Sequence, residues 1–340
     1  MNKRKNSKLG NKKIKVLLVS LTIIGIILLI SGGYIWSKLS SIKKKDINAT
    51  VPDSNKQVQE KYKKDKVDVY YNALFGLDSR LVSGKDDPRS DSIMILSIDK
   101  TRKQIKLSSI IRDSYVEIPG RDGKDKINHA YHFGGPELAV NTINHNFGLA
   151  IEDYAAINFY GLRKVIDAIG GLDIEITEDE LKNLNEHIKD SAKHEGIEPT
   201  YIYDTGMQHL NGLQSTAYCR IRKAEGGDYK RAERQRDVLS KMLKKISSLG
   251  KVKMVSLANE LFPCIETSLS SSEILNLGLD VIKMDLSKID QQQFPTSWQG
   301  KGEAIGKIDY FVSDLDEVKK SMVEYIYEDK KPQNTNNKEK

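Results

Sequence analysis

Arginine is unevenly distributed along this chain, and its placement is the first sign of chemistry. The 340 residues include 12 arginines against 42 lysines, and five of the twelve lie between Arg220 and Arg236. A protein keeps arginine rather than lysine where a planar, permanently charged fork must hold a carboxylate or a phosphate through two hydrogen bonds. The cluster therefore predicts a binding site for an anionic ligand.

The second half of the cluster lies on a predicted helix over residues 229–247. Asp228 is a plausible N-cap for this helix, and Arg231, Arg234 and Gln235 share one face because they are three and four residues apart. Guanidinium groups near a helix N-terminus add to the positive end of the helix dipole, which is unfavourable unless an anion binds there. These side chains are therefore candidate phosphate ligands.

The first half of the cluster has the pattern of a strand over residues 217–222. Alternation with a period of two places Arg220 and Arg222 on one face of that strand. The alternative for the whole cluster is a solvated basic face, or local ion pairs with Glu225 and Glu233. Lysine would serve equally well on such a face, so the choice of arginine favours the anion site.

Three predicted strand ends carry aspartate and arginine together, in segments 76–80, 89–92 and 111–114. Carboxylates suit a hard cation such as Mg²⁺, and arginine neutralises phosphate oxygens. Each turn alone is ordinary capping chemistry, but three in succession before an arginine cluster indicate a phosphate site with a metal. The sequence contains no Gly-rich phosphate loop and no dinucleotide fingerprint, so a soluble nucleotide is not the expected ligand.

A sheet is needed to bring these strand ends together. Buried apolar runs bounded by turn residues predict strands at 67–76, 92–98, 104–110 and 172–176. Apolar periodicity predicts helices at 136–146, 161–169 and 229–247. Because strands alternate with helices, both faces of the sheet should be covered. The sequence predicts an α/β fold, a single αβα-type domain over 67–328 with a central, mainly mixed sheet, preceded by one N-terminal transmembrane helix.

The two ends of the chain differ from this domain. Residues 16–36 are uncharged and apolar, long enough to cross a bilayer as a helix. A cleaved signal peptide is the alternative, but the run is long and no small-residue cleavage site follows it. Seven basic residues precede the span and four follow it, which places residues 1–15 in the cytoplasm. Residues 37–66 are predicted to be a solvated linker, and 329–340 a disordered tail.

Charge supports this division of the chain. The net charge of +7 comes from 54 basic and 47 acidic residues, but residues 1–45 hold eleven basic residues and no acid. Residues 46–340 therefore carry 43 basic and 47 acidic groups, a net of −4, which argues against a nucleic-acid partner. The only two cysteines, Cys219 and Cys264, could form one disulfide or stay free. His129 and His132 favour a turn or core role over a metal pair.

Eight short segments, in order between residues 70 and 240, carry a recognisable set of motifs. They are 74–80, 89–94, 109–116, 126–131, 134–135, 165–171, 208–212 and 220–235. Together they resemble the LytR-CpsA-Psr family of cell-wall glycopolymer ligases, and a single N-terminal anchor fits that family too. Two positions depart from the usual pattern: Ile111 stands where the family usually has proline, and Cys219 is an unusual neighbour for the arginine pair. Neither departure removes a charged group.

The resemblance implies transfer of a glycopolymer from an undecaprenyl phosphate or pyrophosphate carrier to peptidoglycan, through a phosphodiester bond. It implies Mg²⁺, or Mn²⁺ in its place, held by Asp78 and Asp91. The residues implied to bind the pyrophosphate oxygens are Arg89, Arg112, Arg220, Arg222, Arg231 and Gln235, with Arg80 and Arg234 as further candidates. Phosphoryl transfer depends mostly on positioning and charge neutralisation, which agrees with the chemistry of these residues.

Arg112, Asp113 and Asp91 are the candidate catalytic residues. Asp113 could be the base for the incoming hydroxyl, or it could form a structural pair with Arg112. Arg234 could point at the ligand or brace Glu233. A polyprenyl carrier would also require an apolar slot walled by helices, although the apolar face of 136–146 is more typical of a core.

The expected protein is a single-pass type II membrane protein of a Gram-positive bacterium, with its catalytic domain outside the cell. The glycopolymer could be wall teichoic acid, capsular polysaccharide or a similar polymer. One other function is a membrane-bound transcription attenuator, which is disfavoured because only about fifteen residues precede the span. Another is a polyprenyl-pyrophosphate-binding protein or pyrophosphatase without a glycan acceptor, which would use the same residues.

Overall fold

The computed structural model describes residues 42–78, 88–222, 224, 227–249, 257, 262–282 and 284–334. The predicted cytoplasmic residues 1–15, the predicted membrane span 16–36 and Arg80 lie outside these ranges. Within the ranges, no helix combines the length and the apolar character needed to cross a bilayer.

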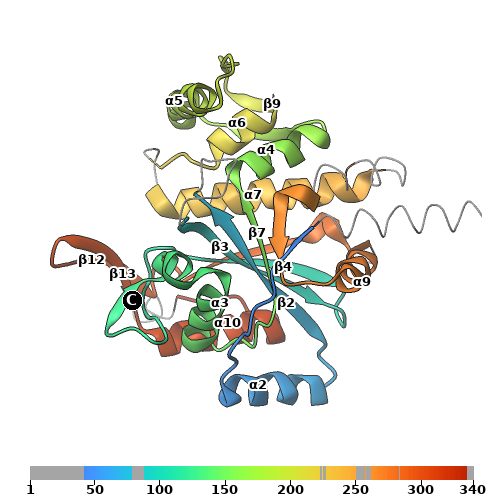
Figure 1. Cartoon of the computed structure of the whole chain (residues 1–340), viewed down its shortest axis with the longest axis vertical. Coiled ribbons are helices and arrows are strands. Elements are labelled where there is room, and N and C mark those ends of the chain that lie inside the picture. Colours follow the sequence, from blue (N-terminus) through green and yellow to red (C-terminus); the bar gives the residue numbers. More distant parts are fainter. Residues whose placement is uncertain are drawn as a thin grey trace, which may run out of the picture.

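A seven-stranded mixed sheet forms the centre of the domain (Figure 1), with its strands in the order β1, β10, β7, β2, β3, β4, β11. β2 and β4 run antiparallel to β3, whereas β7 is parallel to β2 and β11 is parallel to β4. The bounds are β1 Lys43–Lys44, β2 Val69–Leu77, β3 Ser90–Asp99, β4 Gln104–Ile110, β7 Tyr154–Asn158, β10 Ile265–Thr267 and β11 Asp290–Phe294. The three predicted strands at 67–76, 92–98 and 104–110 are confirmed to within two residues.

Helices cover both faces of this sheet. Alternate residues of the central strands are therefore buried on opposite sides. In β2, Tyr71 and Phe75 pack into the core on one face, while Tyr70 packs on the other. The helices on the Tyr71 side are α2 (Asp53–Lys64), α3 (Ile127–Phe147) and α10 (Leu315–Glu328). Those on the other side are α4 (Phe159–Ala168), α7 (Gly227–Ser248) and α9 (Ser271–Ile282). The α/β class with a mixed sheet is therefore confirmed.

A smaller lobe is built onto the α4 side and has a core of its own. Ile174, Leu184 and Ile188 belong to this core, and Val238 of α7 joins them. Since α7 also packs on the main sheet through Leu239, it ties the lobe to the sheet. The lobe contains β8 (Leu172–Ile176), α5 (Glu178–Glu195), β9 (Gly206–Leu210) and α6 (Gly212–Tyr218). The remaining elements are β5 (Tyr115–Glu117), β6 (Lys124–Lys126), η1 (Phe262–Cys264), η2 (Leu286–Lys288), β12 (Gly300–Ile305) and β13 (Ile308–Ser313).

The prediction of a solvated linker over 37–66 is wrong for most of that range. It contains β1 and α2, and α2 packs on the domain through Asn55 and Tyr62. The Asn55 side chain donates hydrogen bonds to two backbone carbonyls, and the Tyr62 ring stacks on Tyr327 at 4.5 Å between centroids. Only two side chains of this helix are buried, so its apolar periodicity is too sparse to detect in sequence.

Three other predicted elements differ from the structure. The strand over 217–222 is wrong, because a capping box between Asn211 and Gln214 starts helix α6, which reaches Tyr218. The helix at 136–146 is the second half of α3, which is kinked at Gly134 and Gly135. The chain after 328 is not wholly a free tail, since the Asp329 carboxylate lies 2.7 Å from the buried Lys106 ammonium.

Candidate active site

The Asp91 carboxylate is the centre of the polar cluster, and only 8% of the residue is exposed. Its Oδ2 accepts hydrogen bonds from Arg112 Nη1 at 3.0 Å, Arg222 Nη2 at 2.7 Å and Arg231 Nη2 at 3.0 Å. The three arginines come from the end of β4, the loop after α6 and the first turns of α7. The structure thus brings together four of the residues that the sequence singled out.

A β-bulge aims Asp91 at these arginines. Gly76 pairs with Ser92 and Leu77 pairs with Ser90, so Asp91 is an extra residue that faces no partner on β2. Such a bulge redirects a side chain, and Asp91 and Ser92 consequently line the same cavity although they are neighbours in sequence. Gly76 is required here because a Cβ at this position would lie 2.8 Å from Ser92 Cβ.

Asp78 and Arg89 lie at the same end of the central strands as Asp91. The Asp78 amide donates a 3.1 Å hydrogen bond to the Arg89 carbonyl, which joins the two chain ends of β2 and β3. Both residues are exposed. The predicted adjacency of Asp78 and Asp91 is therefore present in the backbone, with the Asp78 side chain open to solvent.

Two further carboxylates lie beside the Arg112 guanidinium. Its Nε lies 3.5 Å from Asp113 Oδ2, and its Nη2 lies 3.6 Å from Asp228 Oδ2. Asp113 Oδ1 in turn accepts from Lys126 Nζ at 2.7 Å. The Asp113 carbonyl also accepts a 2.8 Å hydrogen bond from the Phe311 amide of β13, which fixes the turn in place.

The cluster carries more positive than negative charge. Its cations are Arg112, Arg222, Arg231 and Lys126, and its carboxylates are Asp91, Asp113 and Asp228. Lys126 and Asp228 were not assigned to the site from sequence, although Lys126 opens one of the recognised motifs and Asp228 was expected as a helix cap. An anion with two negative charges would turn this excess of positive charge into an excess of negative charge.

Burial and mutual attraction shift the protonation of the cluster. Burial acts to raise the pKa of Asp91, but Arg231, Arg112 and Arg222 outweigh it and hold that pKa below its ordinary value. Burial lowers the pKa of Arg231, and Asp91 offsets only part of that effect. The Nε atoms of Arg112 and Arg231 are buried with no hydrogen-bond partner among the described residues. Arg231 Nε thus has no partner there, whereas Arg112 Nε faces the Asp113 carboxylate.

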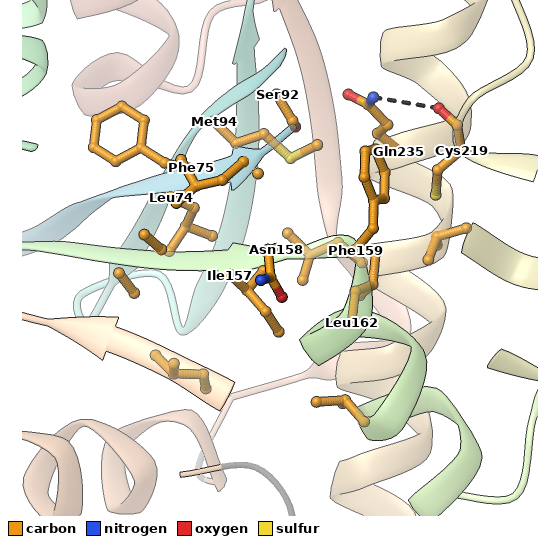
Figure 2. A pocket seen from close by; sticks show the side chains of 18 of the residues that line it. Leu74, Phe75, Ser92, Met94, Ile157, Asn158, Phe159, Leu162, Cys219 and Gln235 are labelled. Atoms are coloured by element: carbon orange, nitrogen blue, oxygen red, sulfur yellow. Dashed lines mark hydrogen bonds between the residues drawn. The ribbon is translucent and has the colours of Figure 1, made fainter. Parts of the chain in front are cut away.

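Two adjoining pockets meet at Asp91. A small one of about 20 Å³ is lined by Arg112, Asp228 and Arg231. A larger cavity of about 290 Å³ extends from the same place between the sheet and α7, and Asp91, Ser92 and Gln235 line both. Figure 2 shows Gln235 and Ser92 at one end of the larger cavity, where the Gln235 side chain donates a 3.3 Å hydrogen bond to the Cys219 carbonyl.

Beyond that polar end, the walls of the larger cavity are almost wholly apolar. Strand residues Leu74, Met94 and Ile157 face helix residues Phe159 and Leu162 across it (Figure 2). The side of α7 contributes Val238, Leu239, Met242 and Ile246. The helix at 136–146 is not among the walls, because α3 packs on the opposite face of the sheet. The shape suits an amphiphile with an anionic head and an apolar tail.

Arg220 and Arg234 lie in ion pairs with α5 instead of with Asp91. Arg220 donates to Ser191 Oγ at 2.8 Å and Asp190 Oδ2 at 2.9 Å. Arg234 Nε donates to the buried Glu180 carboxylate at 2.6 Å, so Glu180, and not Glu233, is its partner. The expected shared face of Arg220 and Arg222 is wrong, because the chain turns between α6 and Arg222 instead of forming a strand.

The donor set at this end of the central strands suits a hard cation only together with a phosphate. No group of three or more His, Cys, Asp or Glu side chains able to hold a metal occurs in the described part of the chain. Mg²⁺ is commonly held by one or two carboxylates with phosphate oxygens and waters, and Asp78 and Asp91 offer that number. His129 Nδ1 lies 2.8 Å from Asp125 Oδ2, as in a local ion pair, and no disulfide joins Cys219 to Cys264.

An arginine-rich pocket that opens into an apolar cavity is the kind of site that binds anionic amphiphiles. This chain belongs to the LytR_cpsA_psr family, whose model matches residues 34–325. The polyisoprenyl-teichoic acid–peptidoglycan teichoic acid transferase TagU of Bacillus anthracis is 33% identical over 244 residues, which cover 70% of this chain and 73% of that protein. TagU of Bacillus mycoides is 31% identical over 312 residues, covering 89% of this chain and 94% of that protein.

Solved structures of the family share the fold. TagT bound to LI-WTA superposes with a TM-score of 0.60 at 26% identity, over 75% of this chain and 89% of that chain. The family protein YwtF (TagT) with bound octaprenyl pyrophosphate lipid superposes with a TM-score of 0.56 at 25% identity, over the same shares of the two chains. A protein of this fold therefore binds a lipid of the kind that the cavity suits.

Proposed function

We propose that this protein transfers an anionic glycopolymer, such as a teichoic acid, from a polyprenyl pyrophosphate carrier to peptidoglycan. The observation that carries this proposal is the continuity of the Asp91 arginine cluster with the apolar cavity. The cluster provides a place for the pyrophosphate, and the cavity for the first part of the lipid. Relatives named as teichoic acid transferases, and TagT with its octaprenyl pyrophosphate, support the same assignment.

The reaction is a displacement at phosphorus. The oxygen of a peptidoglycan sugar hydroxyl forms a bond to the phosphorus that carries the glycopolymer. The bond from that phosphorus to the bridging oxygen breaks, and the lipid leaves as its monophosphate. Arg112, Arg222 and Arg231, which converge on Asp91, would bind the non-bridging oxygens as the charge shifts.

Asp113 is proposed to accept the proton of the incoming hydroxyl. Its carboxylate borders the arginine cluster, and Lys126 and Arg112 hold it in one orientation. A purely structural pairing of Asp113 with these cations is the alternative, and Asp113→Asn separates the two. If Asp113 is the base, this variant binds the donor but transfers it at least about 100-fold more slowly. A structural role predicts lower stability with near-normal turnover of the folded protein.

Asp78 and Asp91 are proposed to hold Mg²⁺, or Mn²⁺ in its place, at the end of the central strands that they share. When bound, the ion would neutralise part of the charge on the pyrophosphate oxygens. The cluster itself is net positive, which opposes a lone cation. Binding of the ion should therefore be coupled to binding of the pyrophosphate.

The catalytic domain is proposed to lie outside the cell of a Gram-positive bacterium, anchored by the apolar span 16–36 in single-pass type II orientation. Transfer to a cell-wall acceptor requires this side of the membrane. A transcription attenuator would instead require the domain in the cytoplasm. A reporter fused after Lys340 distinguishes the two orientations.

The deciding experiment is acceptor-dependent transfer by the full-length protein. The protein is incubated with a polyprenyl-pyrophosphate-linked glycopolymer, peptidoglycan oligomers and Mg²⁺, and the glycan is analysed by mass spectrometry. We expect a phosphodiester-linked product that disappears on chelation. Release of lipid phosphate and sugar phosphate with no linked product would instead identify a pyrophosphatase.

A further inference from the structure

The apolar cavity has a direction, which leads from Asp91 toward one edge of the sheet. Gln235 and Ile246 both line it, and they are eleven positions apart on α7, or about 16 Å along the helix axis. Ile265 of β10 also lines the cavity, and β10 lies three strands from β3, or about 14 Å across the sheet. The end remote from Asp91 is therefore at the β10 edge.

That edge is also where the described chain begins. β1 pairs with β10 through Lys43 opposite Glu266 and Lys44 opposite Thr267, and the Lys45 amide donates to the Thr267 carbonyl at 2.9 Å. The predicted membrane span ends at residue 36, only seven residues before Lys43. A fully extended chain of that length reaches about 25 Å. The remote end of the cavity is thus tethered close to the bilayer.

Three consecutive lysines lie at β1 on this edge. Lys43, Lys44 and Lys45 are all exposed. Lys44 Nζ lies 2.8 Å from Asp46, and the nearby Glu273 also acts on it, so Lys44 is partly neutralised within the protein. Lys43 and Lys45 remain available to lipid headgroups, because lysines near an anionic bilayer each contribute to its binding.

We propose that the β1–β10 edge, with Lys43 and Lys45, faces the surface of an anionic bilayer. The lipid tail of the donor would then pass directly from the bilayer into the Ile246–Ile265 end of the cavity, with its pyrophosphate reaching Asp91. This inference rests on the proposed function and on the predicted anchor. The position of the cavity end and the start of the chain at one sheet edge carry it.

The first test measures lipid contact and needs no transferase activity. Full-length protein with a photoreactive side chain in place of Lys45 is reconstituted in vesicles of phosphatidylglycerol and phosphatidylcholine. The matched control carries the same group in place of Lys63 on α2, which packs on the face of the sheet away from the cavity. We expect about five-fold more lipid adducts at position 45 by mass spectrometry.

Equal lipid labelling at the two positions would overturn the proposal, as would labelling of a protein by position 45 in place of lipid. A chain that does not float with the vesicles would overturn both the anchor and the membrane-facing edge.

The second test compares two donors in the same vesicles. One donor has a long polyprenyl chain embedded in the bilayer, and the other has a short chain that is soluble in water. We expect Lys43→Glu/Lys45→Glu to lower the rate with the embedded donor by about five-fold or more and to leave the soluble-donor rate unchanged. The charge-matched control is Lys63→Glu/Lys64→Glu on α2.

If the edge variant and the control use the embedded donor equally well, the membrane-facing edge is wrong. If the unaltered protein uses neither donor, the proposed function fails, and the labelling experiment alone decides the orientation.

Discussion

Two groups of arginines in this molecule come from nearly the same stretch of sequence but have different surroundings. Arg222 and Arg231, with Arg112, converge on the single carboxylate of Asp91. Arg220 and Arg234 instead each bind a carboxylate on α5, Asp190 and Glu180 respectively. The first group, together with Lys126, shares the carboxylates of Asp91, Asp113 and Asp228 and keeps one positive charge in excess, whereas in the second each guanidinium has a carboxylate of its own. Unequal neutralisation, and not arginine content, distinguishes the proposed ligand site from the arginines that form ion pairs with α5.

The largest expected effect separates the two groups by activity. Arg112→Ala should reduce transfer about 100- to 1,000-fold, because it removes a donor that acts on the charge of the transition state. The stability of the folded protein should change little, since Arg222 and Arg231 still neutralise Asp91. Transfer rates and thermal unfolding of the same preparation measure both. An Arg112→Ala protein with full activity would remove the cluster from the mechanism.

The second prediction is the reverse for the Arg234–Glu180 ion pair, where we expect a loss of stability with little loss of activity. Arg234→Met should lower the free energy of unfolding by about 3 kcal/mol, because it leaves the buried Glu180 carboxylate without a counter-charge. Transfer per folded molecule should stay within a few-fold of normal. Urea unfolding checks the first statement, and Glu180→Leu/Arg234→Met should recover most of the lost stability. A large loss of donor binding by well-folded Arg234→Met would instead place Arg234 on the ligand.

The third prediction concerns the coupling between Mg²⁺ binding and pyrophosphate binding at the cluster. Mg²⁺ should tighten binding of a short polyprenyl pyrophosphate about ten-fold, since cation and anion each offset the charge of the other. Calorimetry with and without Mg²⁺ measures this coupling. Asp78→Asn should abolish it while leaving binding in chelator unchanged, because Asp78 is exposed and lies outside the arginine contacts. Equal coupling in both proteins would exclude Asp78 as a metal ligand.

The smallest expected effect is the pH dependence of stability. The pKa of Asp91 is held below its ordinary value of 3.8 in the folded protein, so the unfolded chain takes up this proton first as the pH falls. The contribution of ionised Asp91 to the stability of the folded protein is complete above about pH 5. It declines as the pH falls below the ordinary pKa, and it is lost below the pKa of Asp91 in the folded protein. Unfolding between pH 5 and 2 should therefore depend less steeply on pH in Asp91→Asn. Identical slopes would mean that the arginines do not stabilise the ionised carboxylate.

Three of the seven strands of the central sheet were predicted from sequence, because their signals are local, whereas the predicted strand at 172–176 pairs with β9 in a separate sheet. Strands β2, β3 and β4 are buried apolar runs bounded by turns, and their ends carry the expected Asp91 and Arg112. The strand over 217–222 failed because alternation of Arg220 and Arg222 is equally compatible with the turn that follows α6. Alternation over six residues is too short a signal to separate these structures.

Other features of the site were outside the reach of local patterns. The partner of Arg234 is Glu180, 54 residues away, and only the folding of the lobe brings them together. Lys126 lies in a recognised motif, but its contact with Asp113 depends on how α3 docks beneath the turn after β4. The cavity draws ordinary apolar residues from β2, β3, β7, α4 and α7, and in sequence these are indistinguishable from core.

The bulge in β3 has a consequence for how the site could be gained or lost. Ile93 and Ile95 face the core on the α3 side, and strict alternation would send the next odd-numbered residue, Asp91, to that same apolar side. The extra residue of the bulge reverses the alternation, and the Asp91 carboxylate therefore lies on the opposite face of the sheet. Deletion of Ser90 would remove the bulge and pair Asp91 with Leu77. The carboxylate would then point into the apolar core, although no charged or ligand-binding residue had been altered. Whether the number of residues in this part of β3 is odd or even thus determines the site as much as the arginines do.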